Sequence, residues 1–68
     1  LEFDLIQNNN TVIEMVDLLG NVVKTIDNQY LSVGHYIYNV NIIDIPNGMY
    51  TLRIISGNFF FNGSVVKN

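Results

Sequence analysis

The 68-residue sequence contains no cysteine, no alanine and no tryptophan, and it has a single proline. Without cysteine the chain has no disulfide, no thiolate zinc site and no thiol nucleophile, so its core holds together without covalent staples. The lack of alanine, the strongest helix former, leaves little support for helices. Cysteine usage indicates no redox compartment, since its absence suits both the cytosol and an extracellular β domain.

Basic residues are also scarce, because Lys24, Arg53 and Lys67 are the only strong bases and the net charge is -3. The chain therefore offers no basic patch for a phosphate backbone, which argues against nucleic acid and against anionic membranes as partners. No apolar run approaches the roughly 20 residues that span a bilayer. The first residues, Leu1 to Asp4, also lack the basic region of a signal peptide.

Strand-forming and turn-forming residues are abundant instead. Val, Ile and Thr supply 20 residues and Asn supplies 11. This mixture predicts short strands joined by Asn-rich turns. With 49% hydrophobic and 13% charged residues the chain is expected to fold, and its length allows one domain, residues 1–68, without an internal boundary or repeat.

Alternation of apolar and polar residues predicts six or seven short strands in an all-β, antiparallel sandwich or barrel. In the fourth strand, which opens at Gly34, the series Tyr36, Tyr38 and Val40 is expected to face inward. Residues 27–29 are expected to close the third strand, with residues 30–33 irregular. The strands are expected at residues 1–6, 11–17, 22–26, 34–40, 49–56 and from 59 onward.

The Gly57-Asn58 pair predicts a two-residue type II′ hairpin turn that pairs Ser56 with Phe59. This register places Phe59 and Phe61 in the core and leaves Phe60 outside, beside Ile55. Phe60 is then the only phenylalanine of the three available to a ligand, which disfavours a platform for sugars or bases.

Apolar residues also fall on the outward face, where they predict self-association. The alternative is that the two sheets bury more of these side chains than simple alternation suggests. The outward series consists of Val12, Val16, Ile37, Met49, Ile55 and Phe60.

Residues for catalysis or metal binding are sparse. His35 is the only imidazole, and neither Ser32 nor Asp44 forms a recognised catalytic signature with it. The acidic residues fall mostly at strand ends and turns, where Asp commonly bonds its own backbone. Asp17 or Asp27 could at most contribute to a weak calcium site. We therefore expect no enzymatic activity, no cofactor and no metal.

Several short motifs occur one after another along the chain, at the ends of the expected strands. An apolar strand is followed by Asp, two residues, Gly, a polar residue and an apolar pair. A second strand opens at a glycine, Ile45 begins an apolar-Pro-Xaa-Gly-Xaa-Tyr motif, and an apolar pair with a lysine closes the chain. The motif positions are Asp17, Gly20, Gly34, Pro46, Gly48, Tyr50, Val65, Val66 and Lys67.

Over nearly the whole chain these motifs resemble the C-terminal sorting domain of proteins exported by the type IX secretion system. The resemblance implies an immunoglobulin-like β-sandwich of about seven strands behind an upstream cargo, which would carry its own N-terminal signal. It also implies recognition by outer-membrane secretion machinery and cleavage by a sorting peptidase. The cargo would then be secreted or held at the cell surface of a Gram-negative bacterium, via the periplasm.

Some features depart from that family's pattern. Gly63 and Ser64 stand where a lysine is common, and the usual Asn-Pro linker ahead of the domain is missing. A second interpretation stays open, in which the chain is a non-catalytic immunoglobulin-like accessory, spacer or adhesion module of a secreted or hook-capping protein. A sorting signal ends its full-length protein, whereas a spacer can lie inside it.

Overall fold

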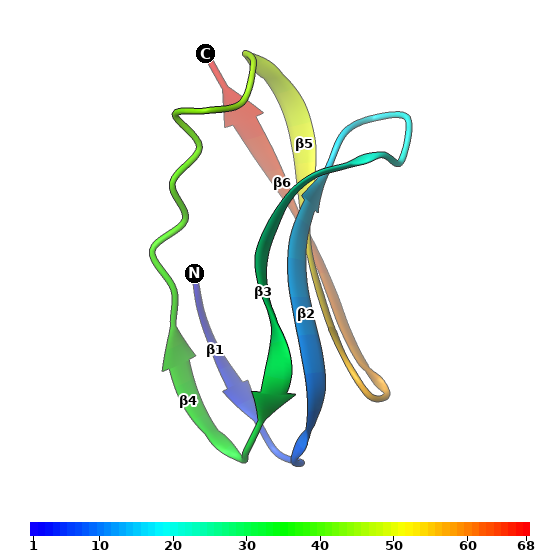
Figure 1. Ribbon diagram of the computed structural model, residues 1–68, viewed down its shortest axis with the longest axis vertical. Coiled ribbons are helices and arrows are strands. Elements are labelled where there is room, and N and C mark those ends of the chain that lie inside the picture. Colours follow the sequence, from blue (N-terminus) through cyan, green and yellow to red (C-terminus); the bar gives the residue numbers. More distant parts are fainter.

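The computed structural model describes residues 1–68 as six strands in two antiparallel sheets (Figure 1). A four-stranded sheet has the order β3-β2-β5-β6, and a two-stranded sheet of β1 and β4 packs against one face of it. The predicted all-β antiparallel sandwich is confirmed. No helix suited to crossing a membrane is present. The strands are β1 (Glu2–Leu5), β2 (Asn9–Val16), β3 (Val22–Leu31), β4 (Gly34–Ile37), β5 (Gly48–Ser56) and β6 (Phe59–Lys67).

The four-stranded sheet consists of two hairpins joined at its centre. A loop at residues 17–21 connects β2 to β3, and Gly57-Asn58 connects β5 to β6. The predicted pairing of Ser56 with Phe59 is confirmed. Gly57 has a φ of 58° while Asn58 has a negative φ, as a type II′ turn requires. The two hairpins meet where β2 pairs with β5, from Thr11 opposite Ser56 to Val16 opposite Thr51.

The core lies between the sheets and is built from alternate residues of the two central strands. Segment 38–47, which crosses from β4 to β5, closes the core with Ile45. Where the core ends, Thr11 and Ser56 bury their hydroxyls and hydrogen bond to each other at 2.8 Å. The buried core cluster consists of Ile13, Met15, Ile45, Tyr50, Leu52 and Ile54.

The third strand is longer than predicted, because it continues to Leu31 instead of ending at Ile26. Residues 27–31 pair with residues 9–13 of β2, which itself begins two residues earlier than expected. The Asp27 carboxylate accepts hydrogen bonds from the Tyr38 hydroxyl and the Gln29 amide, at 2.5 and 2.7 Å. Pairing and tertiary contacts therefore override the turn preference of the Asp-Asn-Gln segment.

The fourth strand is shorter than predicted, since β4 ends at Ile37. The alternation nevertheless has its expected effect, because Tyr38 and Val40 are half-buried against the core. Tyr36 is also half-buried and stacks on Phe3 of β1, with ring centroids 5.6 Å apart. The inward placement of this aromatic series is therefore correct although the strand is not continuous.

The prediction that Val16 faces outward is wrong. The pairing of β2 with β3 shifts register between Met15 and Val16, and both side chains are buried. The extra residue belongs to β3, because Met15 pairs with Lys24 and Val16 pairs with Val22, which leaves Val23 without a partner. This bulge disrupts the regular ladder at the end of β2, where simple alternation no longer predicts which side chain is buried.

The expected burial of Phe59 and Phe61 is also wrong, since they are 41% and 44% exposed. They share the inner face of the sheet with Leu52 and Ile54, as the register requires. However, only two short strands and segment 38–47 cover a four-stranded sheet, and the β6 side near the hairpin turn lacks a cover. All three consecutive phenylalanines are therefore exposed.

Candidate functional site

The first motif forms the β2–β3 loop around the carboxylate of Asp17. Its Oδ1 accepts the backbone N–H groups of Leu19 and Asn21, both at 2.9 Å. These contacts, that of Asn21 foremost, hold the pKa of Asp17 below its ordinary value. Gly20 completes the loop with a φ of 88°, which an L side chain rarely adopts. The motif thus fixes a loop whose apolar tip, Leu18 and Leu19, is exposed.

The Pro-Xaa-Gly-Xaa-Tyr motif anchors the start of β5 to the chain before it. The Tyr50 hydroxyl donates a hydrogen bond to the carbonyl of Pro46 at 2.5 Å, and the ring is buried. Gly48 has a φ of 157°, and a Cβ added there would be in ordinary van der Waals contact with the Tyr50 ring. The spacing of the motif therefore lets the tyrosine close a turn and fill the core at once.

The last motif ties β6 to the same turn. The Lys67 ammonium donates to the carbonyls of Ile45 and Ile43, at 2.5 and 3.2 Å. Val65 is half-buried against the core, whereas Val66 points to the outer face and is 56% exposed. Of these three residues, Val66 has the apolar side chain that a partner can reach.

Most motif positions gather at one end of the sandwich. Figure 1 shows the β2–β3 loop, the start of β5 and the C-terminal end of β6 at the top of the view. Gly48 lies opposite Lys67, and Tyr50 lies opposite Val65. We call this region the motif end, defined by residues 17–21, 46–50 and 65–67. Gly34 lies at the opposite end, where β3 turns into β4.

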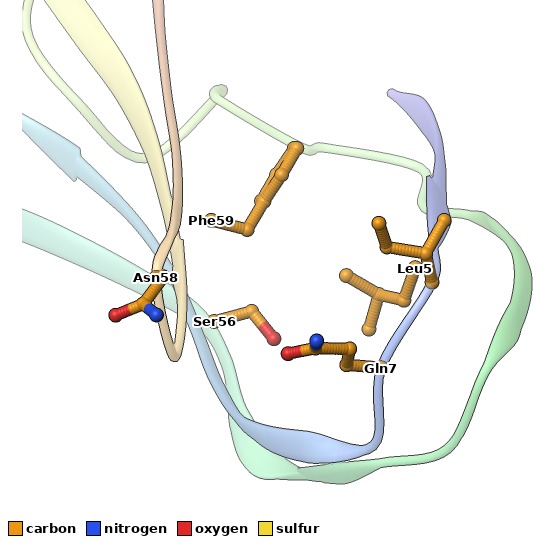
Figure 2. A pocket seen from close by; sticks show the side chains of 6 residues that line it. Leu5, Gln7, Ser56, Asn58 and Phe59 are labelled. Carbon is orange, nitrogen blue, oxygen red and sulfur yellow. The ribbon is translucent and has the colours of Figure 1, made fainter.

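A small open cavity of about 260 Å³ lies away from the motif end, between β1 and the β5–β6 turn. Figure 2 shows Leu5 and Phe59 on opposite sides of it, with the Gln7 and Ser56 side chains pointing toward each other. None of its lining side chains is ionisable, so the cavity has no general acid or base beside the Ser56 hydroxyl, which hydrogen bonds to Thr11 instead. The lining consists of Leu5, Ile6, Gln7, Ser56, Asn58 and Phe59.

His35 lies on the exposed face of the small sheet. Its ring nitrogens contact Asp4 Oδ1 at 2.6 Å and Glu2 Oε2 at 2.5 Å. Both nitrogens are thus engaged by carboxylates, and Asp44 instead pairs with Lys24 at 2.9 Å. No group of three His, Asp or Glu side chains converges to hold a metal ion.

Sequence reasoning missed one ion pair on the outer face. Arg53 Nη2 lies 2.5 Å from Glu14 Oε1, and the two residues are direct cross-strand partners in β2 and β5. Each residue sits at the outward position of its own strand, so knowledge of the β2–β5 register alone would have found the pair.

The entire chain, residues 1–68, matches the family model described as secretion system C-terminal sorting domain. The chain belongs to this family. The sorting domain is therefore a C-terminal signal of type IX secretion, as its motifs predicted, and its family is not catalytic. Neither the curated proteins nor the solved structures contain a match to it. In this sorting domain, Asp17, Tyr50 and Lys67 serve to build and join the loops of the motif end.

Proposed function

We propose that residues 1–68 form one folded unit that directs an upstream cargo of the same chain through the outer membrane. Recognition by secretion machinery follows from the family, and the periplasmic route and removal by a sorting peptidase are part of this proposal. The exported cargo is then secreted or displayed at the cell surface. No finding favours the alternative role of spacer or adhesion module.

In this proposal the secretion machinery recognises the motif end as a folded surface. Lys67 and Val65 are engaged in the fold, while Val66, Leu18 and Leu19 leave apolar side chains exposed beside them. The exposure of Val66 between two tethered neighbours is the observation that carries this assignment. The other motif residues act indirectly, by shaping the turns that hold this surface.

We also propose that the domain has no catalytic activity of its own. His35 is engaged by two carboxylates, and the one cavity lacks ionisable side chains. In the export pathway the domain is therefore a substrate of the peptidase and a ligand of the machinery.

Self-association through the outward face alone receives less support than the sequence suggested. Val16 is buried, and the Glu14–Arg53 ion pair separates Val12, Ile55 and Phe60 from Met49 and Val66 at the other end. Any self-association surface on the large sheet therefore has to include the edge of β6, where apolar residues occur on both faces.

A reporter fusion tests the export proposal. We expect Val66→Glu to leave the reporter in the periplasm, because it places a charge on the proposed contact without touching the core. Val33→Glu is the matched control, since Val33 is equally exposed but lies in the β3–β4 turn. Deletion of residues 65–68 should also block export.

Thermal melting of each purified domain separates recognition from folding. Val66→Glu should melt within a few degrees of the wild type, whereas the deletion removes the Val65 and Lys67 contacts and should melt lower. Surface delivery of the Val66→Glu fusion at the wild-type level would remove Val66 from the recognition surface.

A further inference from the structure

The two edges of the four-stranded sheet differ in how they are protected against pairing with another chain. The β3 edge carries Lys24 and Asp27, and its pairing with β2 is interrupted by two register shifts. In contrast, β6 pairs with β5 without a shift, and residues 59–66 include no charge and no proline. Natural edge strands usually carry charged residues, proline or bulges that prevent pairing with another chain. The edge of β6 is therefore open to an added strand.

The sequence of β6 has a symmetric hydropathy pattern centred on Gly63. Asn62 and Ser64 flank the glycine, and two phenylalanines on one side mirror two valines on the other. In an antiparallel pair with a second β6, polar residues thus oppose polar residues and apolar residues oppose apolar residues. The resulting pairs are Phe60 with Val66, Phe61 with Val65, Asn62 with Ser64, and Gly63 with Gly63.

The backbone groups at the edge fit the same register. In a two-residue hairpin the residues flanking the turn, here Ser56 and Phe59, form a hydrogen-bonded pair, and such pairs alternate along the strands. The N–H and C=O groups of every second β6 residue therefore point to the open edge. These residues, Phe60, Asn62, Ser64 and Val66, are the ones that the symmetric register pairs with each other.

We propose that two copies of this chain associate by antiparallel pairing of their β6 strands about a twofold axis at Gly63. This interface goes beyond the sorting role, and it shares Val66 with the proposed recognition surface, so a paired dimer and bound secretion machinery would compete for that residue. At the axis, facing residues form a non-hydrogen-bonded pair with Cα atoms about 4.5 Å apart, which suits glycine. The ring of Phe61 lies over Gly63, 3.1 Å from the position that a Cβ would take, and fills the space that a side chain would occupy there. The two four-stranded sheets then become one continuous sheet.

A single proline substitution at the edge of β6 tests the pairing. Ser64→Pro removes an N–H group that points away from β5, so the domain keeps its own hydrogen bonds, whereas the dimer loses two. We expect wild type and the matched control Ser64→Ala to sediment as a concentration-dependent dimer. Ser64→Pro should weaken the dimer at least about tenfold. Its thermal melt verifies that it is folded.

Cysteine pairing tests the register, because the chain has no cysteine of its own. Asn62→Cys and Ser64→Cys variants, mixed and oxidised, should form a disulfide-linked dimer far faster than either variant alone. A wild type that stays monomeric at millimolar concentration overturns the proposal, even if a strand of the secretion machinery binds the edge. A dimer that Ser64→Pro leaves intact, or a mixture that links no faster than single variants, also overturns it.

Discussion

Gly20 is the residue whose role is purely conformational. Its φ is 88°, and a Cβ added there would meet no atom within 4 Å, so a substitution changes backbone strain alone. We expect Gly20→Ala to lower the free energy of unfolding by about 1–2 kcal/mol in urea denaturation.

Two controls isolate this effect. A chemically synthesised chain with D-alanine at position 20 should be at least as stable as wild type, because a D residue prefers positive φ. Gly34→Ala should be neutral or stabilising by up to about 1 kcal/mol, since Gly34 has no positive φ and a Cβ there would make ordinary contact with Tyr36. Equal losses for L- and D-alanine at position 20 would contradict the strain argument.

His35 makes the stability of the domain depend on pH. Hydrogen bonds to Asp4 first and then to Glu2 raise the pKa of His35 above its ordinary 6.5. This contribution is fully present below pH 6.5 and is lost as the pH rises through the raised pKa. We expect the melting temperature to fall across that interval, and His35→Gln to abolish the fall. A variant that declines as steeply as wild type would assign the effect to another group.

The acid side of the profile has the opposite sign. Hydrogen bonds hold the pKa values of Asp17, Asp27 and Asp44 below 3.8, chiefly those from Asn21, Tyr38 and Lys24 respectively. Their contribution is present above that value and is lost as the pH falls through the lowered pKa values. The His35→Gln variant should retain this acid limb, so the same titration contains its own internal control.

Among the elements, no backbone–backbone hydrogen bond joins the small sheet to the large one, and only chain connections and side-chain contacts hold them together. β1 and β4 pair with each other, and the Tyr38 hydroxyl, just beyond β4, reaches Asp27 of β3. Burial and this hydrogen bond raise the pKa of Tyr38 to about 12. We expect amides of β1 and β4 to exchange with deuterium well before those of β2 and β5.

A matched pair of substitutions checks this order by mass spectrometry. Phe3→Ala removes the stacking on Tyr36 and Tyr38 and should accelerate exchange in β1 and β4 alone. Ile54→Ala empties the common core and should accelerate exchange everywhere. Equal protection of all six strands in wild type would show that the two sheets open together.

Most elements could be predicted from the sequence because local patterns determine them. Gly57-Asn58 specified its hairpin register, and the alternation around Tyr50 specified the inner face of β5. The extension of β3 to Leu31 and the burial of Val16 could not be predicted in this way. They depend on the β2–β3 pairing, which joins residues up to 22 positions apart and includes shifts of register.

At the scale of the whole molecule, incomplete coverage of the large sheet explains why the predicted burial of Phe59 and Phe61 was wrong. Phe59 and Phe61 lie on the inner face, yet the small sheet does not extend over them, and no local pattern reports the width of an opposing layer. The same limit applies to the motif end. The sequence placed Lys67 among the motif residues, but its contacts with the Ile43 and Ile45 carbonyls arise only from packing.

The β2–β5 pairing also fixes the order in which the chain can fold. Tyr50, Leu52 and Ile54 supply half of the core, and β5 joins the two hairpins. A fragment of residues 1–47 should therefore show a disordered circular dichroism spectrum, whereas the whole chain should refold in milliseconds to seconds, as other non-local β folds do. Native-like spectra from the fragment would refute this. A polypeptide that threads through a narrow pore N-terminal end first thus keeps this domain unfolded until its final strands have emerged.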